Sequence, residues 1–436
     1  MMVALLFALL LPFGLKADVP GGYAVTVSST GTPVAGSPFN NLAAAVTAVP
    51  ATNVPHTITL TGNDPAMGAS QVSVLTNKVI TLTSGAGGPY TITQATAGQR
   101  HLLNNGNITL TLTNIILDGA NTAGGITFNG GNLTLNSGGV IQNCIAPSNG
   151  GNYFGGGVFN QNGTLTMNAG SRISGNEAAT QGGGVANQNG TFNMYGGEIS
   201  GNTVLVPTIT VYAGGGVSCS NAVGQTAPFN MYDGEISGNT AGQGAGVFIH
   251  TATFTMSGGE ISGNTTTSGG AGGVDVNVGG TFIMSGGKIR GNNTAAGAGG
   301  GLSVAPFSTF TMSDGEITGN EAGMGGGVYV VGDVMNHGDA SFDMSGGLIA
   351  GNTATYYGGG VSNQEGVFTM TGGEISGNEA VFSSGGGVWI FGVGTLDMSG
   401  GSIINNTAGS DGGGFLRMTT TTPTAIPRNS HRKPIR

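Results

Sequence analysis

One stretch of the chain decides its fold: Thr191-Phe192-Asn193-Met194-Tyr195-Gly196-Gly197-Glu198-Ile199-Ser200-Gly201-Asn202. Variants of this unit, preceded by Gly-Gly-Gly-Val and a turn, recur down the chain, with Leu135 at the methionine position of an early copy. A period of about 27 residues that tolerates insertions indicates one structural turn per repeat, and we find about ten repeats. The repeated methionines are Met167, Met194, Met231, Met256, Met284, Met312, Met344, Met370 and Met398.

Each unit contains three short strand candidates. In one repeat they are residues 184–187 after the glycines, residues 191–194 and residues 198–200. Strands this short cannot bury a face alone, but stacked repeats let each strand pair with its copy one turn away. The sequence therefore predicts an all-β fold, a single-stranded right-handed parallel β-helix with three sheets around a narrow core.

Three apolar ladders support this stacking. Phe192 and Met194 are two residues apart, so they point to the same face of a strand. An isoleucine and a valine recur once per repeat and are expected to line the other walls, with Leu302 and Phe415 extending the valine row. The ladders comprise Phe192, Phe254, Phe282, Phe310 and Phe368; Ile199, Ile236, Ile261, Ile289, Ile317, Ile349, Ile375 and Ile403; and Val158, Val185, Val217, Val247, Val274, Val328, Val361 and Val388.

An asparagine also recurs once per repeat. Asparagine tolerates the left-handed backbone of a sharp corner, and stacked amides can hydrogen-bond along a ladder. We expect both roles for the series Asn143, Asn176, Asn202, Asn239, Asn264, Asn292, Asn320, Asn352, Asn378 and Asn406.

The N-terminal part supplies the expected cap of the solenoid. Residues 39–49 are the best helix candidate, and a helix there would cover the open end of the first turn. It precedes a strand at residues 56–60. Further strands are expected at 79–83, 90–93 and 108–112, in irregular early turns.

Four segments are expected. The apolar run in residues 1–17 is too short to span a bilayer and suits a cleaved signal peptide, although no Lys or Arg precedes it. Residues 18–130 would form the cap and the first turns, 131–416 the regular repeats, and 417–436 an unstructured Thr/Pro/basic tail. The turn begun at residues 412–415 lacks a cap, which exposes strand edges to end-to-end self-association.

Composition restricts the function classes. The chain has 88 glycines among 436 residues and only 7% charged residues, but its hydrophobic share of 38% argues against disorder. A net charge of −9 disfavours nucleic acid as a partner. The two cysteines, Cys144 and Cys219, fall in different repeats, and we expect free thiols or small space-filling side chains rather than a disulfide.

The repeats resemble those of right-handed β-helix proteins of bacterial surfaces, including the chlamydial polymorphic outer-membrane proteins. The likeness covers residues 100–416 and rests on Gly-Gly-Gly-Val at 182–185, 325–328, 358–361 and 385–388. The second motif differs: those proteins carry Phe-x-x-Asn, whereas this chain carries Phe-x-Met-x-Gly-Gly-Glu-Ile-Ser-Gly-Asn. The resemblance implies an exported, adhesin-like passenger at the cell surface, outer membrane or outside the cell, with an unknown surface protein or glycan as partner and a missing or separate membrane anchor.

Residues 23–60 also look like the start of pectin-lyase-like β-helices, which include polysaccharide lyases and glycosidases. The best enzyme candidate is an acidic row that recurs beside the inward isoleucine: Glu198, Glu235, Glu260, Glu316 and Glu374, interrupted by Lys288. Two carboxyls about 5 Å apart suit a retaining glycosidase. Because the position repeats, we expect a solvated face instead.

A second acidic group lies in one insertion. Asp333, Asp339 and Asp343 accompany His337 there, and either a weak cation site or a plain polar loop fits. Asp233 and Asp314 lie three turns apart, too far to cooperate.

Insertions at 203–213, 218–227 and 331–340 are the best places for binding. Among them, residues 204–212 are apolar and fit either a contact patch or a neutral insertion.

We therefore expect an exported, adhesin-like or structural scaffold with no catalytic, cofactor-binding or metal-binding residues. The alternative is a carbohydrate-active β-helix enzyme.

Overall fold

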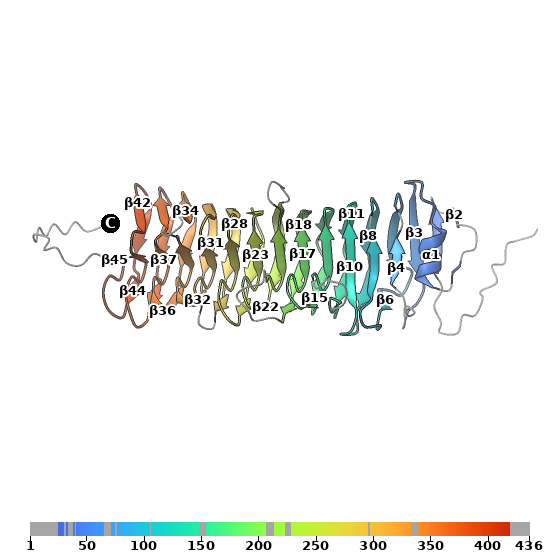
Figure 1. The fold of residues 1–436 in the computed structure, drawn as a ribbon, viewed down its shortest axis with the longest axis horizontal. Coiled ribbons are helices and arrows are strands. Elements are labelled where there is room, and N and C mark those ends of the chain that lie inside the picture. The colour runs from blue at the N-terminus through green and yellow to red at the C-terminus, as the bar shows by residue number, and fades with distance from the viewer. Residues whose placement is uncertain are drawn as a thin grey trace, which may run out of the picture.

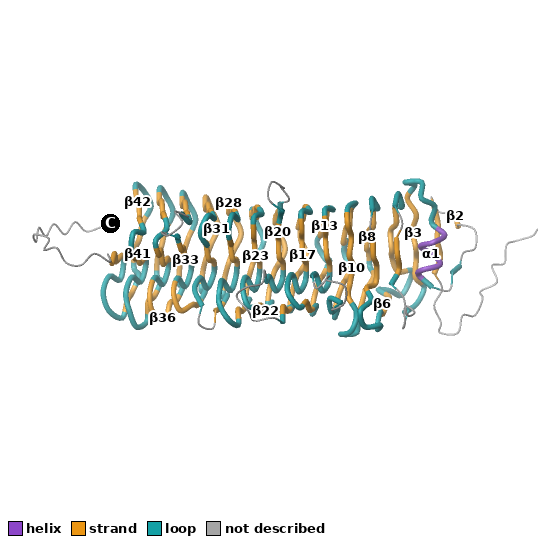
Figure 2. Tube along the Cα trace, viewed as in Figure 1, coloured by secondary structure: helices purple, strands orange, loops and turns teal. Residues whose placement is uncertain are grey.

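The computed structural model describes residues 25–29, 32–33, 38–39, 41–64, 71–74, 76–104, 106–147, 154–205, 213–222, 228–294, 297–333 and 339–418. These residues wind into a long rod, a parallel β-solenoid of about 12 turns (Figure 1). Strands alternate with short loops along its whole length, and the single helix lies at the N-terminal end (Figure 2). The predicted fold class is confirmed, and the right-handed winding stays a prediction.

Sheet B contains the strands that follow the glycine triplets. Its pairings are all parallel and align the valine ladder in register, as in Val185 with Val217. Sheet B consists of β4 (Val72–Val74), β7 (Arg100–Asn104), β10 (Gly124–Asn129), β13 (Val158–Gln161), β17 (Val185–Gln188), β20 (Val217–Ser220), β23 (Val247–His250), β27 (Val274–Asn277), β30 (Leu302–Val304), β33 (Val328–Val331), β37 (Val361–Gln364), β41 (Val388–Phe391) and β45 (Phe415–Met418).

Sheet A unites two of the predicted strands of each repeat. Some turns run through both as one strand, and the register shifts between Met194 and Glu198 place a bend at the paired glycines. Sheet A consists of β1 (Val25–Ser29), β2 (Thr32–Pro33), β3 (Pro55–Leu60), β5 (Val79–Ser84), β6 (Tyr90–Thr93), β8 (Thr109–Thr113), β9 (Ile115–Asp118), β11 (Asn132–Leu135), β12 (Gly139–Gln142), β14 (Thr164–Met167), β15 (Arg172–Ser174), β18 (Thr191–Ser200), β21 (Phe229–Ser237), β24 (Thr253–Met256), β25 (Glu260–Ser262), β28 (Thr281–Arg290), β31 (Thr309–Thr318), β34 (Ser341–Met344), β35 (Leu348–Ala350), β38 (Val367–Met370), β39 (Glu374–Ser376), β42 (Thr395–Met398) and β43 (Ser402–Ile404).

Sheet C is made of strands that directly follow the ladder asparagines. Most are two residues long, such as Thr240–Ala241, with a small inward residue. A strand is recognised in a sequence by apolar and polar residues that alternate over several positions. Two residues are too few to show this pattern, so these strands were not predicted. Sheet C consists of β16 (Glu177–Ala178), β19 (Thr203–Val204), β22 (Thr240–Ala241), β26 (Thr265–Thr266), β29 (Asn293–Thr294), β32 (Glu321–Met324), β36 (Thr353–Tyr357), β40 (Glu379–Ala380) and β44 (Thr407–Ala408).

The core holds the three predicted apolar ladders. Consecutive phenylalanine rings stack face to face with centroids 4.5–5.0 Å apart, which is the spacing of strands within a sheet. Phe229 and Phe342 also belong to this row, although the sequence prediction omitted them. The stack is Phe192, Phe229, Phe254, Phe282, Phe310, Phe342 and Phe368, and every ring is fully buried.

The N-terminal end carries the predicted cap. Helix α1 (Leu42–Ala48) begins after Asn41, whose side chain accepts the Ala44 backbone N–H at 2.8 Å, so the helix is shorter than predicted. At its other end Lys78 Nζ donates to the carbonyls of Val46 and Thr47, at 2.6 and 3.3 Å. Strand β1 runs antiparallel to β3, which covers the first edge of sheet A.

The strands expected in residues 56–60, 79–83, 90–93 and 108–112 are present within a residue or two of those bounds. Strand β45 reaches Met418, two residues past the predicted end of the repeats at 416. The predicted signal peptide, 1–17, and the tail from residue 419 lie outside the described residues. Within the described part of the chain, no helix is long and apolar enough to cross a bilayer.

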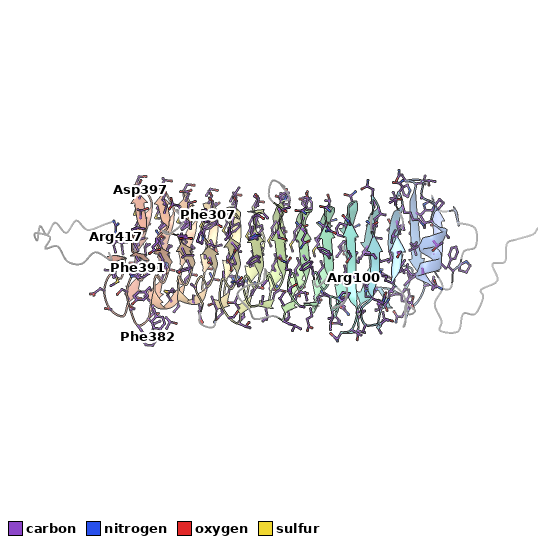
Figure 3. The ribbon with its side chains drawn as sticks, viewed as in Figure 1. Arg100, Phe307, Phe382, Phe391, Asp397 and Arg417 are labelled. Atoms are coloured by element: carbon purple, nitrogen blue, oxygen red, sulfur yellow. The ribbon has the colours of Figure 1, made fainter. Side chains whose placement is uncertain are left out.

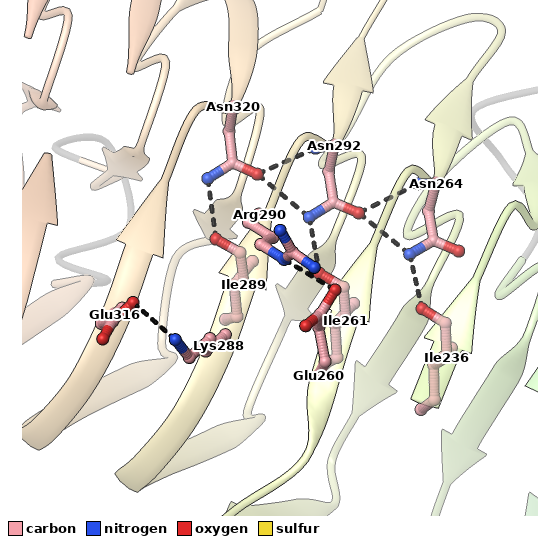
Figure 4. Close-up of polar contacts among 10 residues, drawn as sticks. All are labelled: Ile236, Glu260, Ile261, Asn264, Lys288, Ile289, Arg290, Asn292, Glu316 and Asn320. Carbon is pink, nitrogen blue, oxygen red and sulfur yellow. Dashed lines mark hydrogen bonds and ion pairs between the residues drawn. The ribbon is translucent and has the colours of Figure 1, made fainter. Parts of the chain in front are cut away.

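The asparagine ladder is built of amides that bond along the rod (Figure 4). Asn264 Nδ2 donates to Asn292 Oδ1 at 2.9 Å and to the Ile236 carbonyl at 3.0 Å, and the Asn264 backbone N–H donates to the same Oδ1. The pattern repeats from Asn176 to Asn406. Each amide thus joins three successive turns, as the stacking prediction requires.

The left-handed role predicted for the asparagine series is wrong from Asn176 to Asn406 and holds only for Asn143. The residue with positive φ is the one before each ladder asparagine, which is a glycine such as Gly291 at 60° or Gly319 at 63°, except before Asn406, where it is Asn405. Asn143 occupies that glycine position, with φ of 53°, and Cys144 takes the ladder position, where its N–H donates to Asn176 Oδ1. Asn143 is therefore no ladder member, because the first rung is displaced by one residue.

Candidate functional site

Four of the five glutamates of the predicted row belong to a continuous charged strip on sheet A, whereas Glu374 is separated from it by Leu348. Arg172, Glu198, Glu235, Glu260, Lys288 and Glu316 align residue for residue across six turns. Their side chains alternate in direction with the buried isoleucines, so they face solvent as predicted.

Three ion pairs connect the strip along the rod. Arg172 bonds Glu198 at 3.1 Å, Lys288 bonds Glu316 at 3.2 Å, and Arg290 reaches Glu260 at 2.7 Å. Figure 4 shows the last two pairs beside the asparagine ladder. In each pair both side chains are at least a quarter exposed, so solvent screens the attraction and each pair adds little stability.

The strip borders a shallow, open cleft. Glu198, Asp233, Glu235, Glu260 and Lys288 line it together with glycines, and its volume is about 660 Å³. Asp233 accepts a hydrogen bond from the Gly234 backbone at 2.8 Å. Asp314 makes the same contact with Gly315 three turns away. The arrangement brings carboxylates of adjacent turns side by side on an open surface, where they repeat rather than converge on one point.

The second acidic candidate is described in part. Asp343 is exposed in β34 between the buried Phe342 and Met344, and Asp339 is exposed just before that strand. His337 lies outside the described residues. In the described part of the chain no three His, Cys, Asp or Glu side chains are placed to share a metal ion.

All three insertions proposed for binding are only partly described. Residues 206–212 and 223–227 lie outside the described ranges, as do residues 334–338 of the third. Of the apolar segment 204–212, Val204 is buried in β19 and Leu205 is 56% exposed. Nearer the C-terminal end, Phe382 is 73% exposed (Figure 3).

Both cysteines are free and buried, as predicted. Burial raises the pKa of each thiol to about 12, although the charge of Arg100 opposes this at Cys144 and an Asn187 hydrogen bond opposes it at Cys219. A thiol with such a pKa is a poor nucleophile near neutral pH. These side chains therefore fill space in the core.

The sequence analysis missed several buried ionisable groups in the described turns, and three of them are Arg100, His101 and Asp275. Arg100, labelled in Figure 3, donates to the carbonyls of Gly155 and Phe154 at 2.7 and 2.6 Å, and burial lowers its pKa to about 10. His101 lies 3.1 Å from two carbonyls, and burial lowers its pKa. These contacts hold backbone in the irregular early turns.

The third missed group is Asp275, on the outward side of sheet B. It is only 3% exposed, because the loop before each sheet B strand folds over this row. Burial raises the pKa of its carboxyl to about 7, against a hydrogen bond from the Ala271 backbone. The sequence could have indicated this site, because the residues aligned with Asp275 in the neighbouring turns are the uncharged Phe248 and Ser303.

Comparisons with family models, curated proteins and solved structures find no match to this chain. The chain is a β-solenoid with three parallel sheets.

Proposed function

We propose that this chain is an exported surface scaffold that holds extended partners along its lateral faces, in the manner of an adhesin. The observation that carries the proposal is the charged strip from Arg172 to Glu316, whose members align across six turns on one side of a rod. Groups repeated at one strand spacing, about 4.8 Å, suit a partner that is itself extended, because many weak contacts then act together.

The fold supports a mechanical role. Each turn is joined to its neighbours by backbone ladders, stacked rings and asparagine amides, so the rod has little freedom to bend locally. A rigid support lowers the entropy lost when a long partner binds, because only the partner must be ordered. Export rests on the apolar run in residues 1–17 and on the resemblance to bacterial surface proteins.

A binding experiment tests the proposal directly. Purified chain, residues 18–436, is applied to immobilised cell-wall polymer and extracellular-matrix preparations, beside a variant carrying Glu198→Gln, Glu235→Gln and Glu260→Gln. We expect the parent to bind and the variant, with unchanged unfolding temperature, to bind about tenfold more weakly or not at all. Equal binding by both, or no binding by either, would contradict the role of the strip.

A cleavage assay tests the competing enzyme hypothesis. The same purified chain is incubated with a panel of polysaccharides, with and without calcium, and reducing ends and unsaturated products are measured. The scaffold proposal expects no product. Product formation that survives in the triple Gln variant would overturn the proposal and direct the search to Asp333, Asp339 and Asp343.

A further inference from the structure

Sheet C contains one turn whose exit loop is shorter than those beside it. Only two residues, 323 and 324, lie between Ala322 and the glycine triplet that starts at Gly325. The preceding turn has four residues in that place, 295–298, and the following turn has three, 355–357. A cleft of about 300 Å³ lies beside this short loop, in the face where Figure 1 labels β32 and β36.

The cleft gathers polar groups from three turns. Glu321 Oε2 accepts a hydrogen bond from Asn293 Nδ2 at 3.2 Å, which joins a carboxylate and an amide into one polar wall. Thr355 adds a hydroxyl from the next turn. Together these side chains offer both donors and acceptors. No lysine or arginine lines the cleft, so it has no cation to attract an anionic ligand.

Tyr356 supplies the aromatic surface. Its side chain is 52% exposed on the wall contributed by β36, whereas the adjacent Tyr357 stacks on Trp389. An exposed ring beside converging donors and acceptors offers an apolar face and a polar edge in one concave site. A pyranose has the matching character, with a C–H face and a rim of hydroxyls.

We propose that this cleft binds one neutral sugar unit of a surface glycan, which stacks on Tyr356 and bonds Asn293 and Glu321. The inference rests on the proposed scaffold function and gives it a ligand class. The proposed sugar site is separate from the charged strip, because the cleft lies on sheet C and the strip lies on sheet A.

The test is titration of the purified chain, residues 18–436, with a panel of neutral hexoses and N-acetylhexosamines, followed by calorimetry or ligand-observed NMR. We expect millimolar binding of at least one sugar. Tyr356→Ala should weaken it about tenfold or more. Tyr195→Ala, which removes a tyrosine of similar exposure (51%) on sheet A, should leave it unchanged.

Two outcomes distinguish this inference from the scaffold function. If no neutral sugar binds, or if Tyr356→Ala binds like the parent, the cleft proposal fails while strip-dependent binding to surfaces can stand. If sugar binds in the cleft but the chain holds no cell-wall or matrix preparation, the scaffold function fails and the cleft remains a sugar site.

Discussion

Two groups of Asn292 donate hydrogen bonds to the same oxygen of Asn320: its backbone N–H and its Nδ2 lie 2.9 and 3.0 Å from Asn320 Oδ1. Asn320 in turn donates through Nδ2 to the Ile289 carbonyl and to Asn352 Oδ1. One side chain therefore satisfies buried groups in the turns on both sides of it. The stability of the rod should depend on such side chains more than their small apolar area suggests.

Replacing Asn320 with alanine should destabilise the chain strongly. The change leaves two buried donors of Asn292 without an acceptor, and each such group costs about 1–3 kcal/mol. We expect a loss of unfolding free energy on the order of 3 kcal/mol or more, measured by denaturant titration. Thr318→Ala, two residues earlier on the outward side of β31, is the matched control. A loss no larger than that of the control would refute a structural role for the ladder.

The corner glycines should tolerate asparagine better than alanine. Gly319 has φ of 63°, and a Cβ added there would meet nothing within 4 Å, so only backbone strain opposes a side chain. Left-handed backbone costs alanine about 1–2 kcal/mol. Asparagine costs less, as its presence at the equivalent Asn143 and Asn405 indicates. Thermal unfolding should rank the proteins parent, Gly319→Asn, Gly319→Ala, and a reversed order of the variants would contradict this reading.

The phenylalanine stack should accept leucine but not alanine. Phe282 is fully buried between Phe254 and Phe310, so Phe282→Ala should lose about 3–5 kcal/mol through a cavity in the middle of the rod. Phe282→Leu should lose much less, because the same row contains leucine at Leu165 and Leu396. Denaturant unfolding measures both, and similar losses for the two variants would show that ring stacking rather than filled volume dominates.

Asp275 should make stability depend on pH near neutrality. Its pKa in the fold is about 7, above the usual value of about 3.9 in an unfolded chain. Between these values the unfolded state releases the proton and the folded state keeps it, so stability falls as pH rises towards 7 and then levels off. Asp275→Asn should match the parent below pH 4 and be more stable above pH 7.

That comparison is made by thermal unfolding of both proteins across the pH range. The difference in stability above pH 7 should be on the order of a few kcal/mol at most. Asp397→Asn is a suitable control, because Asp397 is exposed on β42 near the C-terminal end (Figure 3). Parallel pH curves for the parent and Asp275→Asn would show that the buried carboxyl is ionised in the fold.

Much of the fold was readable from sequence because its signals repeat once per turn. Phe192 and Met194 alternate with outward residues, and their copies recur at the same positions, so both the strand and the stacking could be predicted. Sheet C could not, since a pair such as Thr240–Ala241 has no period to detect. Asn143 was misassigned because asparagine suits both a left-handed corner and the ladder, and only the backbone register separates the two.

The candidate sites were less predictable for a geometric reason. The glutamate row and its outward direction follow from alternation, but the ion pair from Arg290 to Glu260 is diagonal, since Arg290 pairs in register with Ser262. Burial of Asp275 depends on a loop that folds over the outer face of sheet B. The cleft beside Tyr356 combines residues of three turns whose loops differ in length in the sequence, and a search for regularity overlooks such differences.

The uniform junction between turns also bears on how such a gene can evolve. From Asn176 to Asn406 every turn presents the same amide oxygen and amide donors to the next, and from Phe192 to Phe368 the same ring face. Unequal recombination that adds or removes one whole repeat there creates no new kind of contact. It only changes the reach of the rod, by one strand spacing of about 4.8 Å. Length can thus vary between alleles by whole turns while the fold stays the same.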